Sequence, residues 1–199
     1  MTVDMGIVPS IEEIKNQRRS LHQSWEQLRI DRGATGVRFE KQRQLELVGK
    51  VNALIEMAGT AEKKMLTGLE PDRNEWAAYL DVGRMISVWN DLGGAPRGIL
   101  GLVRFLDSLH FAAQPINQVE SALLAMLLTG SDPIQSGDEM DVHQIAMMLP
   151  FADLMIVDRR MRHYLNHLGL PERYSTKVFS SADWRGIDHF LERLERKQG

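Results

Sequence analysis

Three carboxylates within one short stretch of the chain have the residue type and spacing of a cation site. Asp138 and Asp141 lie three residues apart, so on a helix their side chains would share one face. Asp158 directly follows an apolar run, Leu154 to Val157, and ligands of parallel α/β sheets bind beyond the carboxyl ends of the strands. Carboxylate oxygens are the ligands that Mg²⁺ and Mn²⁺ prefer, with waters completing the shell. The pattern therefore suggests a divalent-cation site, although Asp158 can equally cap a helix that begins at Arg159.

The composition excludes several classes of protein. The chain has 199 residues and no cysteine, which excludes a disulfide framework, a cysteine-ligated zinc site and a thiol nucleophile. The length suits one domain with a sizeable core. The longest apolar run, Ala122 to Leu128, is too short to cross a bilayer, and Met1 to Glu13 lacks the layout of a signal peptide. We therefore expect a cytoplasmic protein with no membrane partner.

The charge is unevenly distributed along the chain, although the net charge is only -3. Residues 1–70 carry a net +1, residues 71–150 a net -6 and residues 151–199 a net +2. A nearly neutral chain is not a general binder of nucleic acid. An acidic middle between locally basic ends could hold a cation with phosphates around it, and an ordinary solvated surface is the alternative.

Most of the sequence predicts helix. After Asp141 to Leu149, which predicts a short helix, two apolar runs without alternation are separated by a helical segment, and this predicts a small buried parallel sheet. Pro115 fits the first turn of another helix. The predicted helices and strands are Ser10 to about Gly33, Phe39 to Met57, a helix opened by Pro71 and Asp72, a helix carrying Ile99 to Leu106, Pro115 to Leu128, Asp141 to Leu149, strand Leu154 to Val157, Arg159 to Leu168, strand Lys177 to Ser180, and Asp183 to Arg196.

Two segments resemble a known family. The run from Phe105 to Met161 resembles the C-terminal half of divergent bacterial PIN-like domains, in which an Asp near the start of a short helix precedes an LPY-like turn and a hydrophobic strand that ends in Asp. Here these elements are Asp141, Leu149-Pro150-Phe151 and Leu154 to Asp158. The segment GIVPSIEEIKNQRRSL, Gly6 to Leu21, resembles the turn and helix that follow the family's first strand.

The resemblance implies a helix-rich, three-layer α/β fold with a small parallel sheet. It implies a single PIN-like domain over residues 1–199, with a helical half at 1–110 and an acidic α/β half at 111–199. The activity that it implies is a ribonuclease dependent on Mg²⁺ or Mn²⁺, which hydrolyses RNA phosphodiesters with clustered carboxylates. RNA would be the substrate, and a toxin–antitoxin pair is a setting that the resemblance suggests.

Carried over position by position, the resemblance assigns the catalytic and metal-binding acids. Asp141 would be the helix acid, Asp158 the strand-end acid and Glu13 the acid of the early helix. Asp138 would be an additional metal ligand, and Asp153 is a neighbour of lower rank. We expect Glu13, Asp141 and Asp158 to point into one cleft.

Arginines lie next to these acids. Arg159 and Arg160 follow Asp158, and Arg18 follows Glu13. In a nuclease they would bind backbone phosphates, which positions a substrate without reading its sequence. For any one of them, a surface charge facing an acidic partner is the plainer interpretation.

The chain departs from the family at its start. PIN-like domains begin with a strand that carries an Asp, whereas this sequence offers only Met1 to Val8, with Asp4, before the first predicted helix. The alternative function is therefore a catalytically silent, helical interaction or regulatory module with a degenerate PIN-like fold. Its partner would be a protein such as an antitoxin, or a second copy in a homo-oligomer.

Two further interpretations are weaker. His163 and His167 lie four apart on a predicted helix, the spacing of a two-histidine zinc clamp, but the sequence identifies no third ligand. A DNA-binding regulator is disfavoured by the nearly neutral charge and by the lack of a helix-turn-helix pattern.

Overall fold

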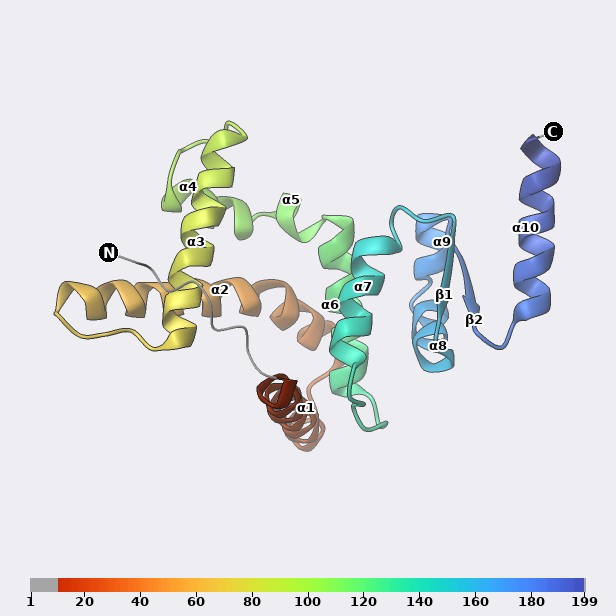
Figure 1. Ribbon diagram of the computed structural model, residues 1–199, viewed down its shortest axis with the longest axis horizontal. Helices are drawn as coiled ribbons and strands as arrows, with labels where there is room; N and C mark the ends of the chain where they lie inside the picture. Colours follow the sequence, from red (N-terminus) through yellow and green to blue (C-terminus); the bar gives the residue numbers. More distant parts are fainter. Residues whose placement is uncertain (1–10, 199) are drawn as a thin grey trace. The chain divides into compact units, whose positions relative to one another are not determined.

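The computed structural model describes residues 11–198, and over this range it contains ten helices and one two-stranded sheet (Figure 1). The protein is thus mostly helical with a small parallel sheet. None of the helices in this range is long and apolar enough to cross a membrane. The elements are α1 (Ile11–Ala34), α2 (Phe39–Leu66), α3 (Arg73–Asp91), α4 (Ile99–Leu106), α5 (Leu109–Ala112), α6 (Pro115–Thr129), α7 (Asp138–Met148), β1 (Leu154–Val157), α8 (Arg159–His167), α9 (Leu170–Tyr174), β2 (Lys177–Ser180) and α10 (Trp184–Gln198).

The chain forms two compact units. The first contains the described residues up to Gln42 together with those from Ala122 onward, and the second contains Arg43–Ser121. These bounds differ from the predicted halves at 1–110 and 111–199, because α1 belongs with the C-terminal part of the chain. The prediction of a single PIN-like domain stays a prediction.

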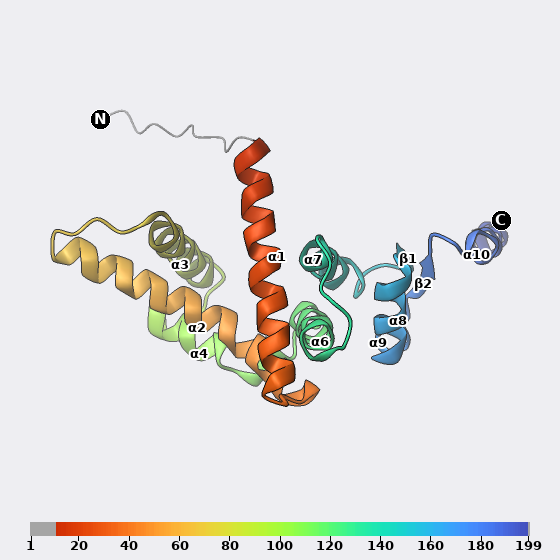
Figure 2. The same cartoon turned by 90° about the horizontal axis from the view of Figure 1, so that it is seen from below.

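The part of helix α6 from Ala122 onward lies in the core of the first unit. The helix begins at Pro115, as predicted, and Leu123, Leu124, Leu127 and Leu128 are all 0–1% exposed. A helix that is apolar on every side is stable only when other elements surround it. Helix α7 lies beside it (Figures 1 and 2), and the core is completed by side chains of α7, α8 and their flanks: Val142, Ile145, Ala146, Leu149, Met161, Tyr164, Leu165 and Leu170.

The parallel pairing of the two predicted strands is confirmed. Leu154 lies opposite Lys177 and Val157 opposite Ser180, and α8 contacts β2. Parallel neighbours need a crossover connection, which the segment containing α8 and α9 provides. The prediction that the sheet is fully buried is wrong for β1, because Ile156 is 46% exposed. All four residues of β1 are apolar, so the sequence shows no alternation of apolar and polar residues, although one face of the strand is partly exposed to solvent.

Helix α1 is attached to the segment between α6 and α7 by hydrogen bonds. Glu26 accepts from the backbone N–H of Ile134 at 2.9 Å, and His22 Nε2 donates to the Ile134 carbonyl at 2.7 Å. Arg29 binds both carboxylate oxygens of Glu26 and donates to the carbonyl of Gly130 at 3.3 Å. Charge-assisted hydrogen bonds of this kind are stronger than neutral ones. These hydrogen bonds therefore hold α1 against the segment between α6 and α7.

The second unit has a smaller core. Ala78 and Val82 of α3 pack with Ala58 and Leu54 of α2. Asp72 caps α3 in a reciprocal capping box, which explains why the helix begins directly after it. In α3, the ring of Trp89 stacks on that of Phe105 with 5.2 Å between the ring centroids, whereas Trp76 and Leu80 are 38% and 53% exposed.

Replacing Glu26 by Gln should loosen α1. The hydrogen bonds from Arg29 and from Ile134 hold the pKa of Glu26 down to about 2 from its ordinary 4.5. A lowered carboxyl pKa stabilises the fold above pH 4.5, and this contribution is lost as the pH falls toward 2. We expect Glu26→Gln to lower the free energy of unfolding by about 1–3 kcal/mol at pH 7.

Urea titrations at several pH values measure this change, with Glu12→Gln, an exposed position on the same helix, as the control. The difference between wild type and Glu26→Gln should shrink between pH 4.5 and 2. A difference that does not change with pH would contradict the assignment.

Candidate functional site

Asp141 and Asp158 line the same groove, which we name the α7–β1 groove. It has a volume of about 550 Å³ and is formed by one side of α7, by β1 and by the beginning of α8. Its other walls are mostly apolar, including Ile145, Met148 and Ile156. The first turn of α7 supplies one acid, and the carboxyl end of β1 supplies the other, at the sheet edge where parallel α/β folds bind ligands.

The carboxyl group of Asp141 is in an unfavourable environment for a negative charge. Its pKa is raised above the ordinary value, first by burial and then by the charges of Asp158 and Asp138. Among the described residues no side chain donates a hydrogen bond to it or forms an ion pair with it. A cation beside Asp141 would stabilise its negatively charged form.

Asp158 also has a structural role. Its Oδ1 accepts a hydrogen bond from the backbone N–H of Met161 at 2.8 Å, so it is the N-cap of α8. The second carboxylate oxygen makes no side-chain bond within the described part of the chain. The two interpretations of this residue are therefore compatible, because a cap uses one oxygen and leaves the other for a ligand.

Asp138 is held by other residues. It is only 5% exposed, and it accepts hydrogen bonds from Arg160 and from the backbone N–H of Gln135 at 2.5 and 2.6 Å. Arg160 in turn donates to the carbonyl of Pro133 and lies over the ring of Tyr164. Both residues of this ion pair are thus occupied with joining the first turn of α7 to α8.

The remaining predicted site residues are placed differently. Arg159 is exposed beside Asp158, and its charge contributes to lowering the pKa of Asp183, after the hydrogen bonds from Ser180. Arg18 is exposed on α1 and lines a second cavity. Asp153 is exposed and does not line the α7–β1 groove.

The acids predicted near the start of the chain are not tested by the structure. Asp4 and Ser10 lie outside the described residues, and so does the side chain of Glu13, although its backbone belongs to α1. The convergence of Glu13 with Asp141 and Asp158 therefore stays a prediction. Within residues 11–198, the described side chains include no group of three or more His, Asp or Glu placed to hold a metal ion.

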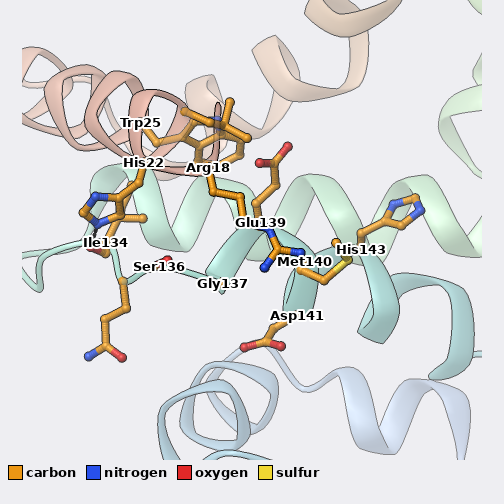
Figure 3. A pocket seen from close by; sticks show the side chains of 12 residues that line it. Arg18, His22, Trp25, Ile134, Ser136, Gly137, Glu139, Met140, Asp141 and His143 are labelled. Atoms are coloured by element: carbon orange, nitrogen blue, oxygen red, sulfur yellow. Dashed lines mark hydrogen bonds between the residues drawn. The ribbon is translucent and has the colours of Figure 1, made fainter. Parts of the chain in front are cut away.

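The second cavity was missed by sequence reasoning. We name it the α1–α7 cavity; it has a volume of about 580 Å³ and lies between α1 and the start of α7 (Figure 3). Trp25 of α1 is half-buried and lines it. Glu139, half-buried and next to Asp138, points from α7 toward α1, whereas Asp141 points to the opposite side of α7 (Figure 3). The only signal in the sequence was the run of acids in this turn.

Comparison with family models, with curated proteins and with solved structures gave no match to this chain in any of the three. A function for this protein must therefore be inferred from its residues and their arrangement.

The Asp138–Arg160 ion pair predicts that two neighbouring arginines differ strongly in their contribution to the stability of the fold. Removing one partner of a buried ion pair leaves an uncompensated charge, which costs about 3–5 kcal/mol. Because the Arg160 side chain keeps 18% exposure, we expect Arg160→Met to lower the free energy of unfolding by about 3 kcal/mol. Arg159→Met, at an exposed position, should change it by less than ~0.5 kcal/mol.

Thermal and urea unfolding of the two variants measure the difference. Equal losses of stability in both variants would show that Arg160 does not have the structural role described above.

Proposed function

We propose that the protein is a divalent-cation-dependent ribonuclease of PIN-like type, with its site at the acid end of the α7–β1 groove. The observation that carries the proposal is that Asp141 and Asp158, from two different elements, line one groove at the carboxyl end of a parallel strand. The raised pKa of Asp141 supports it, because burial and, after it, the charges of Asp158 and Asp138 disfavour the carboxylate, and a nearby cation would offset both effects.

The residues fit Mg²⁺ or Mn²⁺ in part. Mg²⁺ is commonly held by one or two carboxylates, several waters and the phosphates of a substrate, so Asp141 and Asp158 would be sufficient protein ligands. Asp138 fits less well, because Arg160 already compensates its charge. Glu13 remains the expected third acid. When bound, such a cation lowers the pKa of a bound water and stabilises the charge that develops during phosphodiester hydrolysis.

The chain's own residues would position the substrate. Asp158 is held by its capping bond to Met161, which fixes the direction of its carboxylate. Arg159, exposed on the next residue, would contact a backbone phosphate without reading the base. Arg160 is engaged with Asp138, so we assign it to positioning α7 on α8. Arg18 lines the α1–α7 cavity and is not part of the lining of the α7–β1 groove.

The first test is thermal unfolding with and without millimolar Mn²⁺. A ligand that binds only the folded state raises the stability by about 2.7 kcal/mol at one hundred times its dissociation constant. We expect this rise in wild type and its loss in Asp158→Asn, a substitution that keeps the cap because Asn caps helices as well as Asp does. Asp153→Asn is the matched control and should keep the rise.

Cleavage of a labelled single-stranded RNA with Mn²⁺ is then expected in wild type and in Asp153→Asn, and not in Asp158→Asn. If no variant shows a Mn²⁺-dependent rise and wild type leaves RNA intact, the proposal is wrong.

Asp141→Asn makes a separate prediction in the absence of metal. A carboxyl whose pKa is raised in the folded state favours folding at low pH, and this contribution is lost as the pH rises through the folded-state pKa. Neutral Asn removes the repulsion at pH 7, so Asp141→Asn should melt at a higher temperature than wild type in EDTA. Differential scanning calorimetry at pH 3.5 and pH 7 should show this gain only at the higher pH, and a gain of equal size at both would contradict it.

A second candidate is favoured by the apolar walls of the groove. Met148, Phe151 and Ile156 at or near it are 59%, 76% and 46% exposed. We infer that a silent interaction module would bind a protein segment there that carries apolar residues followed by a Lys or Arg, which complements the carboxylates at the acid end. An antitoxin segment of this composition would satisfy both candidates.

Selection of displayed peptides on the purified chain tests this candidate. Peptides with a basic residue next to apolar ones should be enriched on wild type and lost on Asp141→Asn. Enrichment without that composition would exclude it.

A further inference from the structure

The α1–α7 cavity has the lining of a small-molecule site. Its volume of about 580 Å³ lies within the range of ~300–1,000 Å³ that is typical of ligand pockets. Trp25 supplies an aromatic surface, and Leu21 and Met140 supply apolar walls. Arg18 and Glu139 supply opposite charges from the two helices that enclose it. Apolar walls with a few polar groups that converge are what such sites require.

The walls of the cavity are fixed by the contacts of α1. His22 lines it and donates to the Ile134 carbonyl at 2.7 Å, one turn before Glu26 accepts from the Ile134 N–H at 2.9 Å. Trp25 lies between these two anchors along the helix. The Trp25 indole therefore belongs to the segment of α1 that is hydrogen-bonded to Ile134, and it faces the first turn of α7 across the cavity (Figure 3).

Two charged side chains that line the cavity have no side-chain partner in the described part of the chain. The carboxylate of Glu139 and the guanidinium of Arg18 make no hydrogen bond or ion pair to another side chain within the described residues. Glu139 points toward α1, and the Arg18 side chain extends toward α7 (Figure 3). A ligand in the cavity could therefore donate hydrogen bonds to the two carboxylate oxygens of Glu139 and accept hydrogen bonds from the guanidinium of Arg18.

We propose that the α1–α7 cavity binds a guanine base. Trp25 would stack on its plane, as aromatic side chains do with unstacked bases. Guanine is the natural base with two neighbouring N–H donors, N1–H and the N2 amine, on its pairing edge, and these match the two oxygens of Glu139. Its O6 and N7 are the acceptors that Arg favours, so Arg18 would contact the other edge. Adenine presents an acceptor at N1 and would face the carboxylate with a repulsive lone pair.

The cavity is joined to the proposed cation site through Asp141, which lines both the cavity and the α7–β1 groove. As a substrate subsite the inference rests on the proposed function: a nucleotide whose base enters the cavity would place a neighbouring phosphodiester near Asp141. The same base can come from an RNA strand or from a free guanosine nucleotide.

Binding in EDTA tests the subsite apart from any cleavage. GMP, IMP and AMP are titrated against the full chain and followed by calorimetry. We expect GMP to bind at least about tenfold more tightly than AMP, the discrimination typical of a bidentate pair to a base edge. IMP lacks only the N2 amine and should fall between the two. No binding of GMP, or equal binding of all three, would overturn the proposal.

Variants assign the contacts. Glu139→Gln should lose the preference for GMP over AMP, because Gln can also pair with adenine, whereas Asp153→Asn should keep it. Trp25→Ala should weaken all three nucleotides, and Trp25→Phe, which keeps a stacking surface and guards against misfolding, should restore most of the affinity. Trp184→Phe is the matched control on exposed α10. A GMP preference that survives Glu139→Gln would refute the assignment.

A single-stranded RNA with one guanosine, compared with the same strand carrying adenosine, separates the two sources. A guanosine strand that binds more tightly than both the adenosine strand and GMP identifies RNA as the source, whereas tighter binding of GMP than of the guanosine strand identifies the free nucleotide. Equal binding of the two strands, both tighter than GMP, would contradict the base assignment. If GMP binds and RNA is never cleaved, the ribonuclease proposal fails and the guanine site stands. If RNA is cleaved without a guanine preference, only the guanine site fails.

Discussion

The ion pair between Asp138 and Arg160 is the contact on which the geometry of the first unit depends. It joins the first turn of α7 to the first turn of α8, two elements separated in sequence by β1 and its turn. With side-chain exposures of 7% and 18%, neither charge has enough water around it to stand alone. Because Asp158 caps α8 and Asp141 lies one turn beyond Asp138, the pair fixes the position of one carboxylate relative to the other.

The Asp138–Arg160 ion pair also limits how many carboxylates are left for a ligand at the α7–β1 groove. Of the three acids that the sequence grouped together, one is compensated by Arg160, and the two that line the groove are left to interact with a ligand. With two such carboxylates, the cation site that we propose would rely on waters and substrate phosphates more than on a closed cage of protein ligands. The pKa of Asp141 is raised first by burial and then by the charges of Asp158 and Asp138, and Arg160 donates to Asp138.

Local features of the site were predictable from sequence, and long-range ones were not. The strand Leu154 to Val157, its parallel partner at Lys177 to Ser180 and the capping role open to Asp158 follow from short apolar runs and from the residue after the strand. The attachment of α1 joins Glu26 to Ile134, 108 positions away, and no spacing rule reports such a contact. The partner of Asp138 could not be predicted for the same reason: Arg160 is basic and lies two residues after Asp158, so it was grouped with phosphate-binding arginines.

The placement of α1 also means that the start of α7 lines two different cavities. Glu139 and Asp141 are two residues apart, so on a helix they point in nearly opposite directions. One side faces the cavity closed by α1, and the other faces β1 and α8. Acids in the first turn of a helix are stabilised by the helix dipole, and of the acids in this turn only Asp138 has a charged partner among the described side chains, namely Arg160. The pKa of Asp141 is raised first by burial and then by the charges of Asp158 and Asp138. The side of the turn that faces the groove is therefore the one where a cation would relieve an unfavourable charge.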